Sequence, residues 1–81
     1  MKFEYVYQLH SEHSRDRPYT GRTTDLEARF ARHNHGQATH TRKFKPWRID
    51  VAVAFRDHPK AVAFECNLKS SSGRAFAKRH F

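Results

Sequence analysis

The chain has 81 residues, and its 16 lysines and arginines against 8 acidic residues give a net charge of +8. At this length we expect one small domain over residues 1–81, in which periodic apolar positions and 14% aromatic residues favour a folded core over disorder. The charge favours a polyanionic partner, above all nucleic acid; the alternative is a soluble basic protein without such a partner.

The cellular compartment is indicated by cysteine content and hydropathy. Cys66 is the single cysteine, which excludes an intramolecular disulfide and a thiolate metal centre and fits a reducing cytosol. The first residues lead into a strand pattern without an apolar signal core, and the longest apolar run, residues 51–55, is too short to span a bilayer. We therefore expect a cytoplasmic protein that is neither secreted nor inserted into a membrane.

Period-two alternation predicts a half-buried first strand, with apolar side chains at every second position: Phe3, Tyr5, Tyr7 and Leu9. Tyr5 and Tyr7 therefore share one face of the sheet. Residues 10–16 are polar and turn-like, and residues 17–22 predict a short second strand that returns as an antiparallel hairpin and ends at Gly21.

A capping-box pattern follows, in which Thr24 is the N-cap and Glu27 reaches back to it. It predicts a helix that runs to about His35, where Gly36 in the left-handed conformation closes it. Residues 37–47 then form a long basic loop.

Alternation resumes in a third strand, whose large apolar residues are expected on one face: Ile49, Val51, Val53 and Phe55. Asp57 and Pro59 supply the start of a helix through Lys69. One stripe of this helix carries Ala61, Phe64, Glu65 and Leu68. Residues 70–73 are expected to break that helix, and residues 74–80 to form a last short basic one. The predicted order is strand, strand, helix, strand, helix, helix, an α+β fold.

Phosphodiester hydrolysis needs an activated water, a cation at the scissile phosphate and stabilisation of the leaving oxygen. The first helix offers a cation, because Arg29 and His33 share a stripe with the core positions Leu26 and Phe30. A guanidinium held there is preorganised for bidentate contact with phosphate oxygens. The alternative is an ordinary arginine of an amphipathic helix that reaches out to solvent.

Glu65 occupies an apolar stripe position between Phe64 and Leu68, where an uncompensated carboxylate would be costly, so we expect something positive to face it. One carboxylate together with substrate phosphates and waters can hold a hard ion such as Mg²⁺ or Mn²⁺. The alternative is a salt bridge to Arg29 or to a neighbouring lysine.

Tyr7 and Tyr19 can point across the hairpin to the same side, where one of them would act as general base or proton relay. A phenol titrates near pH ~10, so adjacent cations must lower its pKa, and Arg22, Arg29 and metal-bound water are available for this. The pattern does not choose between the two tyrosines. The alternative is that both fill a small core. The histidines show no zinc-type spacing with a third ligand, so we expect no structural zinc.

These residues together resemble the GIY-YIG nuclease family, in particular its small single-domain bacterial members related to the nuclease module of the excision-repair incision enzyme. The first motif is Tyr5-Val6-Tyr7 in place of Gly-Ile-Tyr, and the second is Tyr19-Thr20-Gly21. The resemblance spans nearly the whole chain. It implies a three-stranded antiparallel sheet flanked by helices, a single divalent ion and cleavage of DNA.

The resemblance also implies catalytic roles for five residues: Tyr7, Tyr19, Arg29, His33 and Glu65. Glu65 is implied as the metal ligand, Gly21 as the tight end of the second strand, and Arg22 as the usual basic position after it. His33 matches a family position usually filled by Tyr or His, and its alternative is a solvated surface histidine. An Asn found near the glutamate helix of larger members has no clear equivalent here.

We expect basic and aromatic residues to contact nucleic acid: Arg22, Arg42, Lys43, Lys45, Trp47, Lys69 and Arg74. Trp47 has two interpretations, stacking on an unpaired base or packing under the long loop. The resulting hypothesis is a metal-dependent DNA endonuclease or nuclease-like repair protein acting on branched, flapped or nicked DNA. The alternative is a nucleic-acid-binding module that kept the scaffold and lost efficient turnover.

Overall fold

The computed structural model describes residues 2–13, 18–38 and 41–81. Its strands are β1, Glu4–Ser11; β2, Pro18–Thr23; and β3, Trp47–Phe55. Its helices are α1, Leu26–Asn34; α2, His58–Lys69; and α3, Ser71–His80, with a short 3-10 turn at Arg42–Phe44. This order confirms the predicted α+β fold, and the strands form the expected antiparallel sheet in the order β2-β1-β3.

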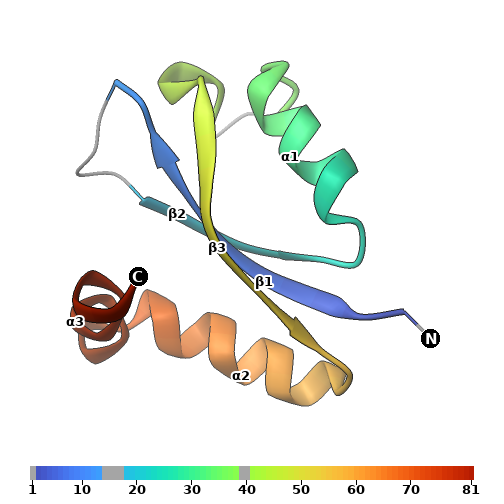
Figure 1. Ribbon diagram of the computed structural model, residues 1–81, viewed down its shortest axis with the longest axis vertical. Coiled ribbons are helices and arrows are strands. Elements are labelled where there is room, and N and C mark those ends of the chain that lie inside the picture. The colour runs from blue at the N-terminus through green and yellow to red at the C-terminus, as the bar shows by residue number, and fades with distance from the viewer. Residues whose placement is uncertain (1, 14–17, 39–40) are drawn as a thin grey trace.

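Helices cover both faces of the sheet, with α1 on one face and α2 and α3 on the other (Figure 1). We call these the α1 face and the α2 face. The central strand β1 is therefore buried on both sides: Tyr7 and Leu9 belong to the core under α1, and Val6 belongs to the core under α2. Val6 and Tyr7 are each only 1% exposed. The expectation of a half-buried first strand is wrong, because its polar-looking side is covered as well.

Gly21 lies inside β2, directly opposite Tyr7 of β1, and is not the strand end that the sequence predicts. A Cβ atom at this position would stand 2.5 Å from the Tyr7 hydroxyl oxygen and 3.0 Å from a ring carbon of Tyr19. The Tyr7 ring therefore lies over this residue. Glycine is needed here because of that close approach, not because the chain turns.

A β-bulge interrupts the alternation of β3. The register with β1 skips Asp50, which leaves Ile49 and Val51 on opposite faces of the sheet. Trp47 consequently packs in the core of the α1 face, whereas Phe55 packs in that of the α2 face. The expectation that Ile49 shares a face with the later apolar residues of this strand is wrong for this reason.

The helix α1 begins one residue later than predicted, because Asp25 is its N-cap instead of Thr24. An oxygen of the Asp25 carboxylate accepts a hydrogen bond from the amide of Ala28 at 3.1 Å. At the other end, Gly36 has a φ of 75°, the left-handed conformation that the sequence predicts.

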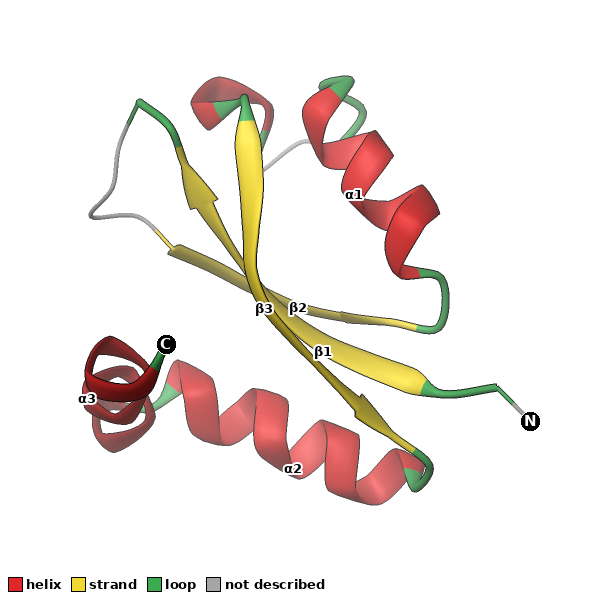
Figure 2. Cartoon of the chain, in the orientation of Figure 1, coloured by secondary structure: helices red, strands yellow, loops and turns green. Residues whose placement is uncertain are grey.

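Figure 2 shows that only a short loop separates α2 from α3. Ser70 ends α2 and also caps α3, since its hydroxyl accepts from the amide of Gly73 at 3.1 Å. The predicted break over residues 70–73 is therefore too long. Gly73 lies within α3, and a Cβ there would overlap the carbonyl oxygen of Asn67, so this glycine permits the close approach of α3 to the end of α2.

Two of the predicted loops lie partly outside the described residues, namely positions 14–16 of the turn over 10–16 and positions 39–40 of the loop over 37–47. The first position of the predicted second strand, residue 17, lies outside them as well. Among the helices of the described ranges, none combines the length and the apolar character that a membrane span requires.

Candidate active site

Three buried side chains on the α1 face, Tyr7, His33 and Thr41, form what we call the tyrosine–histidine cluster. The Tyr7 hydroxyl oxygen lies 3.0 Å from His33 Nε2, and His33 Nδ1 lies 2.7 Å from the Thr41 hydroxyl, which reaches the Ala38 carbonyl at 3.5 Å. Neutral imidazole has one donor and one acceptor. Thr41 thus donates to Ala38, His33 donates to Thr41, and Tyr7 donates to His33.

Burial sets the protonation of this cluster. It lowers the pKa of His33 below its ordinary value of 6.5, and the charges of Arg29 and Arg32 add to the fall. Burial raises the pKa of Tyr7 to about 12, with Tyr19 adding to the rise and Arg29 partly offsetting it. Arg29 lowers the pKa of Tyr7, as expected of an adjacent cation, but desolvation outweighs it. At neutral pH both groups are uncharged.

Tyr19 and Arg29 border the cluster. The half-buried Tyr19 ring packs against His33, with 4.9 Å between ring centroids, and its centroid is 6.4 Å from that of Tyr7. Arg29 is half-buried and forms no ion pair with any residue in the described part of the chain. His33 is 1% exposed, so the alternative of a solvated surface histidine is wrong.

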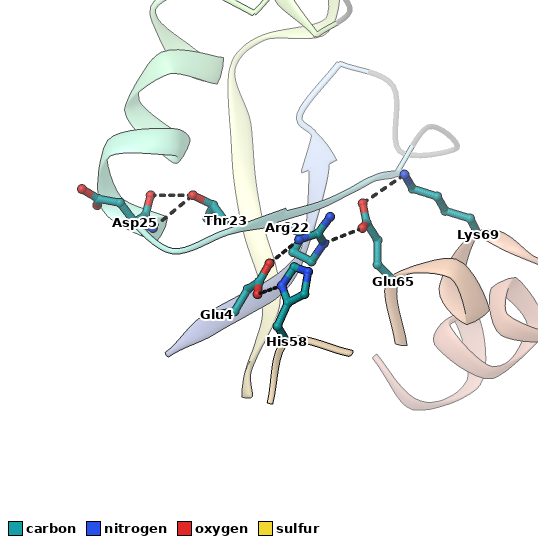
Figure 3. A network of polar contacts seen from close by, with 7 residues as sticks. All are labelled: Glu4, Arg22, Thr23, Asp25, His58, Glu65 and Lys69. Carbon is teal, nitrogen blue, oxygen red and sulfur yellow. Dashed lines mark hydrogen bonds and ion pairs between the residues drawn. The ribbon is translucent and has the colours of Figure 1, made fainter. Parts of the chain in front are cut away.

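Charged side chains and one histidine on the α2 face form a second group, which we call the carboxylate–arginine network. Figure 3 shows its members: Glu4, Arg22, His58, Glu65 and Lys69. Glu65 Oε1 accepts from Arg22 Nε at 3.0 Å, and Glu65 Oε2 accepts from Lys69 Nζ at 3.1 Å. The cation that faces Glu65 is thus partly the neighbouring lysine, as one alternative predicts, but the arginine is Arg22 and not Arg29.

The environment of Glu65 is half-buried and positive. Burial raises its pKa, but the hydrogen bonds from Arg22 and Lys69 together outweigh burial and hold the pKa below its ordinary value of 4.5. The side chain is 16% exposed. Glu65 is therefore an ionised carboxylate with limited access to solvent.

Glu4 and His58 belong to this network and were not singled out from the sequence. Arg22 Nη1 donates to Glu4 Oε2, and His58 Nδ1 donates to Glu4 Oε1 at 2.6 Å. Hydrogen bonds from His58 and Arg22 hold the pKa of Glu4 below its ordinary value of 4.5. One sequence pattern pointed to Glu4, because period-two alternation places it on the face opposite Tyr7. No such pattern pointed to Thr41, since it lies in a loop.

The two groups reach β2 at consecutive residues. The Tyr7 hydroxyl lies over Gly21 from the α1 face, and Glu65 binds the side chain of Arg22 from the α2 face. Since β2 is an edge strand, nothing in the sheet lies beyond it on that side. The charge of Glu65 even contributes, as a minor cause after burial, to the raised pKa of Tyr7. Tyr7 and Glu65 thus reach neighbouring residues of the outer strand from opposite faces of the sheet.

The donor set of this region suits a hydrated hard cation. Within residues 2–13, 18–38 and 41–81, no group of three or more histidine, cysteine or acidic side chains is arranged to hold a metal ion. Each oxygen of Glu65 accepts one hydrogen bond and keeps a further lone pair. One such carboxylate, with water and phosphate oxygens as the remaining ligands, fits Mg²⁺ or Mn²⁺.

A cleft of about 610 Å³ crosses the edge of the sheet beside this region. Its lining joins Tyr19 and Trp47 from the α1 face to Lys69 and Arg74 from the helices of the other face. Trp47 is only 4% exposed, packs against Tyr19, and donates its indole N–H to the carbonyl oxygen of Thr41 at 2.8 Å. The structure therefore favours packing under the loop over base stacking for this ring.

The other predicted nucleic-acid contacts are mostly at the surface. Arg42, Lys43 and Lys45 are exposed on the segment that follows Thr41. Arg74, at the start of α3, is exposed and donates to the carbonyl oxygen of Lys69 at 3.3 Å. Of these exposed side chains, Arg74 lines the cleft.

This chain is similar to known proteins over most of its length. The family model described as the GIY-YIG catalytic domain matches residues 3–79. A UPF0213 protein of Cupriavidus necator is 40% identical over 76 residues, which cover 89% of this chain and 80% of that protein. A UPF0213 protein of Cupriavidus pinatubonensis is 44% identical over 55 residues, which cover 67% of this chain and 61% of that protein's length. No solved structure matches the chain.

Proposed function

Because this chain belongs to the GIY-YIG family, whose fold is of the nuclease type, we propose that it is a metal-dependent endonuclease that hydrolyses phosphodiester bonds in DNA. One observation carries the proposal: an ionised, half-buried carboxylate and a buried tyrosine hydroxyl reach neighbouring residues of the same edge strand, from opposite faces. A catalytic carboxylate and a proton-handling group need this kind of proximity at an open edge.

In this proposal Glu65 holds the divalent ion, which supplies Lewis-acid stabilisation of charge on the phosphate. Arg29 binds a non-bridging phosphate oxygen. Its guanidinium is held at the edge of the core and makes no ion pair with a described residue, so no carboxylate of the described residues competes with the phosphate.

Tyr7 orients the attacking water, with His33 behind it. The Tyr7 hydroxyl donates its proton to His33 Nε2, so lone pairs of the phenol oxygen remain to accept a hydrogen bond from water. As Tyr7 accepts the water proton, His33 Nε2 can take the phenol proton, because the neutral imidazole is already aligned with it. Tyr19, against the same imidazole, lines the cleft and contacts the substrate.

Basic side chains would bind the DNA backbone: Arg22, Arg42, Lys43, Lys45, Lys69 and Arg74. Two of them, Lys69 and Arg74, line the cleft. Contacts to phosphate carry no sequence information, so such a surface selects DNA by its shape. We therefore propose nicked, flapped or branched DNA as substrate and a role in DNA repair or processing in the cytoplasm.

A second candidate function is a binding module on the same scaffold with weak turnover. The observation that favours it is the pairing of both Glu65 oxygens with protein cations, which opposes entry of a metal ion. Such a module would keep the salt-dependent affinity for DNA that a net charge of +8 provides.

A cleavage assay separates these functions. Nicked, flapped and branched DNA is incubated with Mg²⁺ or Mn²⁺ and the protein, its Glu65→Ala variant, or Glu12→Ala as a control that removes one exposed carboxylate elsewhere. Loss of several kcal/mol of metal stabilisation predicts that Glu65→Ala lowers the cleavage rate by about 10³-fold or more. DNA affinity should survive, and Glu12→Ala should cleave normally. Binding without cleavage on every substrate would instead establish the module.

A further inference from the structure

The network on the α2 face includes two residues to which the proposed hydrolysis gives no role, Glu4 and His58. We propose that Glu4, oriented by His58, is the docking group for Arg22 when a divalent ion occupies Glu65. Glu4 is then a positioning residue that sets the metal affinity of the site. This inference rests on the proposed function, because it takes Glu65 as the metal ligand.

The need for such a group follows from charge. Glu65 Oε1 lies 3.0 Å from Arg22 Nε and its Oε2 lies 3.1 Å from Lys69 Nζ, so an approaching dication meets two positive groups at the carboxylate that should bind it. Like charges in a partly desolvated site repel strongly. At least one of the two cations must move its charge away from Glu65 before the ion can bind well.

Lys69 can withdraw into water. Its side chain is 56% exposed and flexible, and an exposed ion pair of this kind is weak. Arg22 has less freedom, because its side chain is only 31% exposed and starts from a strand. A guanidinium in that position needs a partner inside the protein once it leaves Glu65.

Glu4 already supplies that partner. Arg22 uses different nitrogens for its two acceptors, Nη1 for Glu4 and Nε for Glu65. The contact with Glu65 can therefore break while the contact with Glu4 persists. The sheet register fixes this arrangement, because Arg22 pairs with Val6, and Glu4 lies two residues before Val6 on the same face.

His58 holds Glu4 ready for this role. It donates to Glu4 Oε1, the oxygen that Arg22 does not use, from the first turn of the same helix that carries Glu65. Glu4 is 13% exposed, so its carboxylate is kept in place by this contact and by its surroundings. The docking group is thus oriented from the side opposite Arg22.

The experiment measures Mn²⁺ affinity without DNA, from the electron paramagnetic resonance signal of unbound Mn²⁺. Among the described residues, Glu4→Gln leaves Arg22 with Glu65 as its one acidic partner, so Mn²⁺ should bind about tenfold more weakly, within the coupling typical of one ion-pair network. Arg22→Gln should bind Mn²⁺ more tightly than the unmodified protein. His58→Ala, at a position 65% exposed, should weaken binding in the same direction but less. Glu12→Gln is the charge-matched control and should leave the affinity unchanged.

The double variant Glu4→Gln/Arg22→Gln decides between positioning and ligation. Without Arg22 the docking group is not needed, so the double variant should bind Mn²⁺ as tightly as Arg22→Gln alone. If it binds as weakly as Glu4→Gln, then Glu4 is a metal ligand and the inference is overturned. An unchanged affinity in Glu4→Gln also overturns it. If Glu65→Gln binds Mn²⁺ as well as the unmodified protein does, the metal role of Glu65 fails, and with it the proposed function.

Discussion

The tyrosine–histidine cluster and the carboxylate–arginine network approach one strand from opposite faces, and they are held in different ways. The cluster is buried and neutral, and its hydroxyls and imidazole form a single chain of hydrogen bonds. The network is ionic, with side chains that range from 13% exposed at Glu4 to 65% at His58. Removing a buried partner leaves an unsatisfied group, whereas the exposed members of the network, Lys69 and His58, exchange their partners for water at little cost. The tyrosine–histidine cluster is therefore fixed by folding, and the carboxylate–arginine network can rearrange.

The largest effect on stability is expected at Gly21, the residue of β2 that lies beneath the Tyr7 ring and next to Arg22. Gly21→Ala places a methyl group 2.5 Å from the Tyr7 hydroxyl oxygen, which cannot retreat because His33 lies behind it. Overpacking of this kind should lower the free energy of unfolding by about 3 kcal/mol, measured by urea denaturation. A variant as stable as the unmodified protein would show that the Tyr7 ring does not press on this strand.

Removing one hydrogen bond of the tyrosine–histidine cluster, between Tyr7 and His33, should have the next largest effect on stability. Tyr7→Phe removes the donor to His33 Nε2 and leaves a buried acceptor unsatisfied, which should cost about 2 kcal/mol of unfolding free energy. Tyr19→Phe is the matched control, because its ring is half-buried in the same region and its hydroxyl bonds no described residue. Equal losses in the two variants would contradict the chain of hydrogen bonds.

The tyrosine–histidine cluster and the carboxylate–arginine network should lose stability in different pH ranges. The pKa of His33 is lowered by burial, so the folded state binds fewer protons there, and stability should fall as pH drops below 6.5. The pKa values of Glu4 and Glu65 are lowered by their cationic partners, so their contribution should be lost only below 4.5. Denaturation of His33→Gln across this range checks the assignment, since its loss between pH 6.5 and 5 should be smaller. An unchanged profile would refute it.

The smallest effect is expected in the carboxylate–arginine network. Glu4→Gln replaces the carboxylate that pairs with Arg22 by a neutral amide and should lower the free energy of unfolding less than Tyr7→Phe does. The same denaturation series, run at low and high salt, measures it. A loss as large as that of Tyr7→Phe would show that the network holds the fold and does not merely set up the site.

Much of the fold could be predicted from local patterns, as the confirmed order of elements and the left-handed Gly36 illustrate. The errors came from long-range contacts. The β1–β2 register places the Tyr7 ring over Gly21. The β-bulge at Asp50 in β3 explains why Trp47 and Phe55 lie on opposite faces of the sheet. Tertiary packing decides such features, and period-two alternation alone cannot.

The candidate site was predictable to a similar degree. The stripe position of Glu65 correctly required a positive partner, but strand register chose Arg22 over Arg29. The burial of both faces of β1 was not predicted, and this burial is the main cause of the raised pKa of Tyr7. Thr41 enters through a loop that carries no periodic signal.

The proposed divalent ion binds at Glu65, beside the strand β2 that the cluster and the network both reach. Substoichiometric Mn²⁺ added to the ¹⁵N-labelled protein locates it, because the paramagnetic ion broadens the amide signals closest to it. The signals of Gly21, Arg22 and Glu65 should disappear first, and Glu65→Gln should abolish this order. Earliest broadening instead near His10 and Asp50, the paired groups that line a separate hollow, would show that the ion does not bind at Glu65.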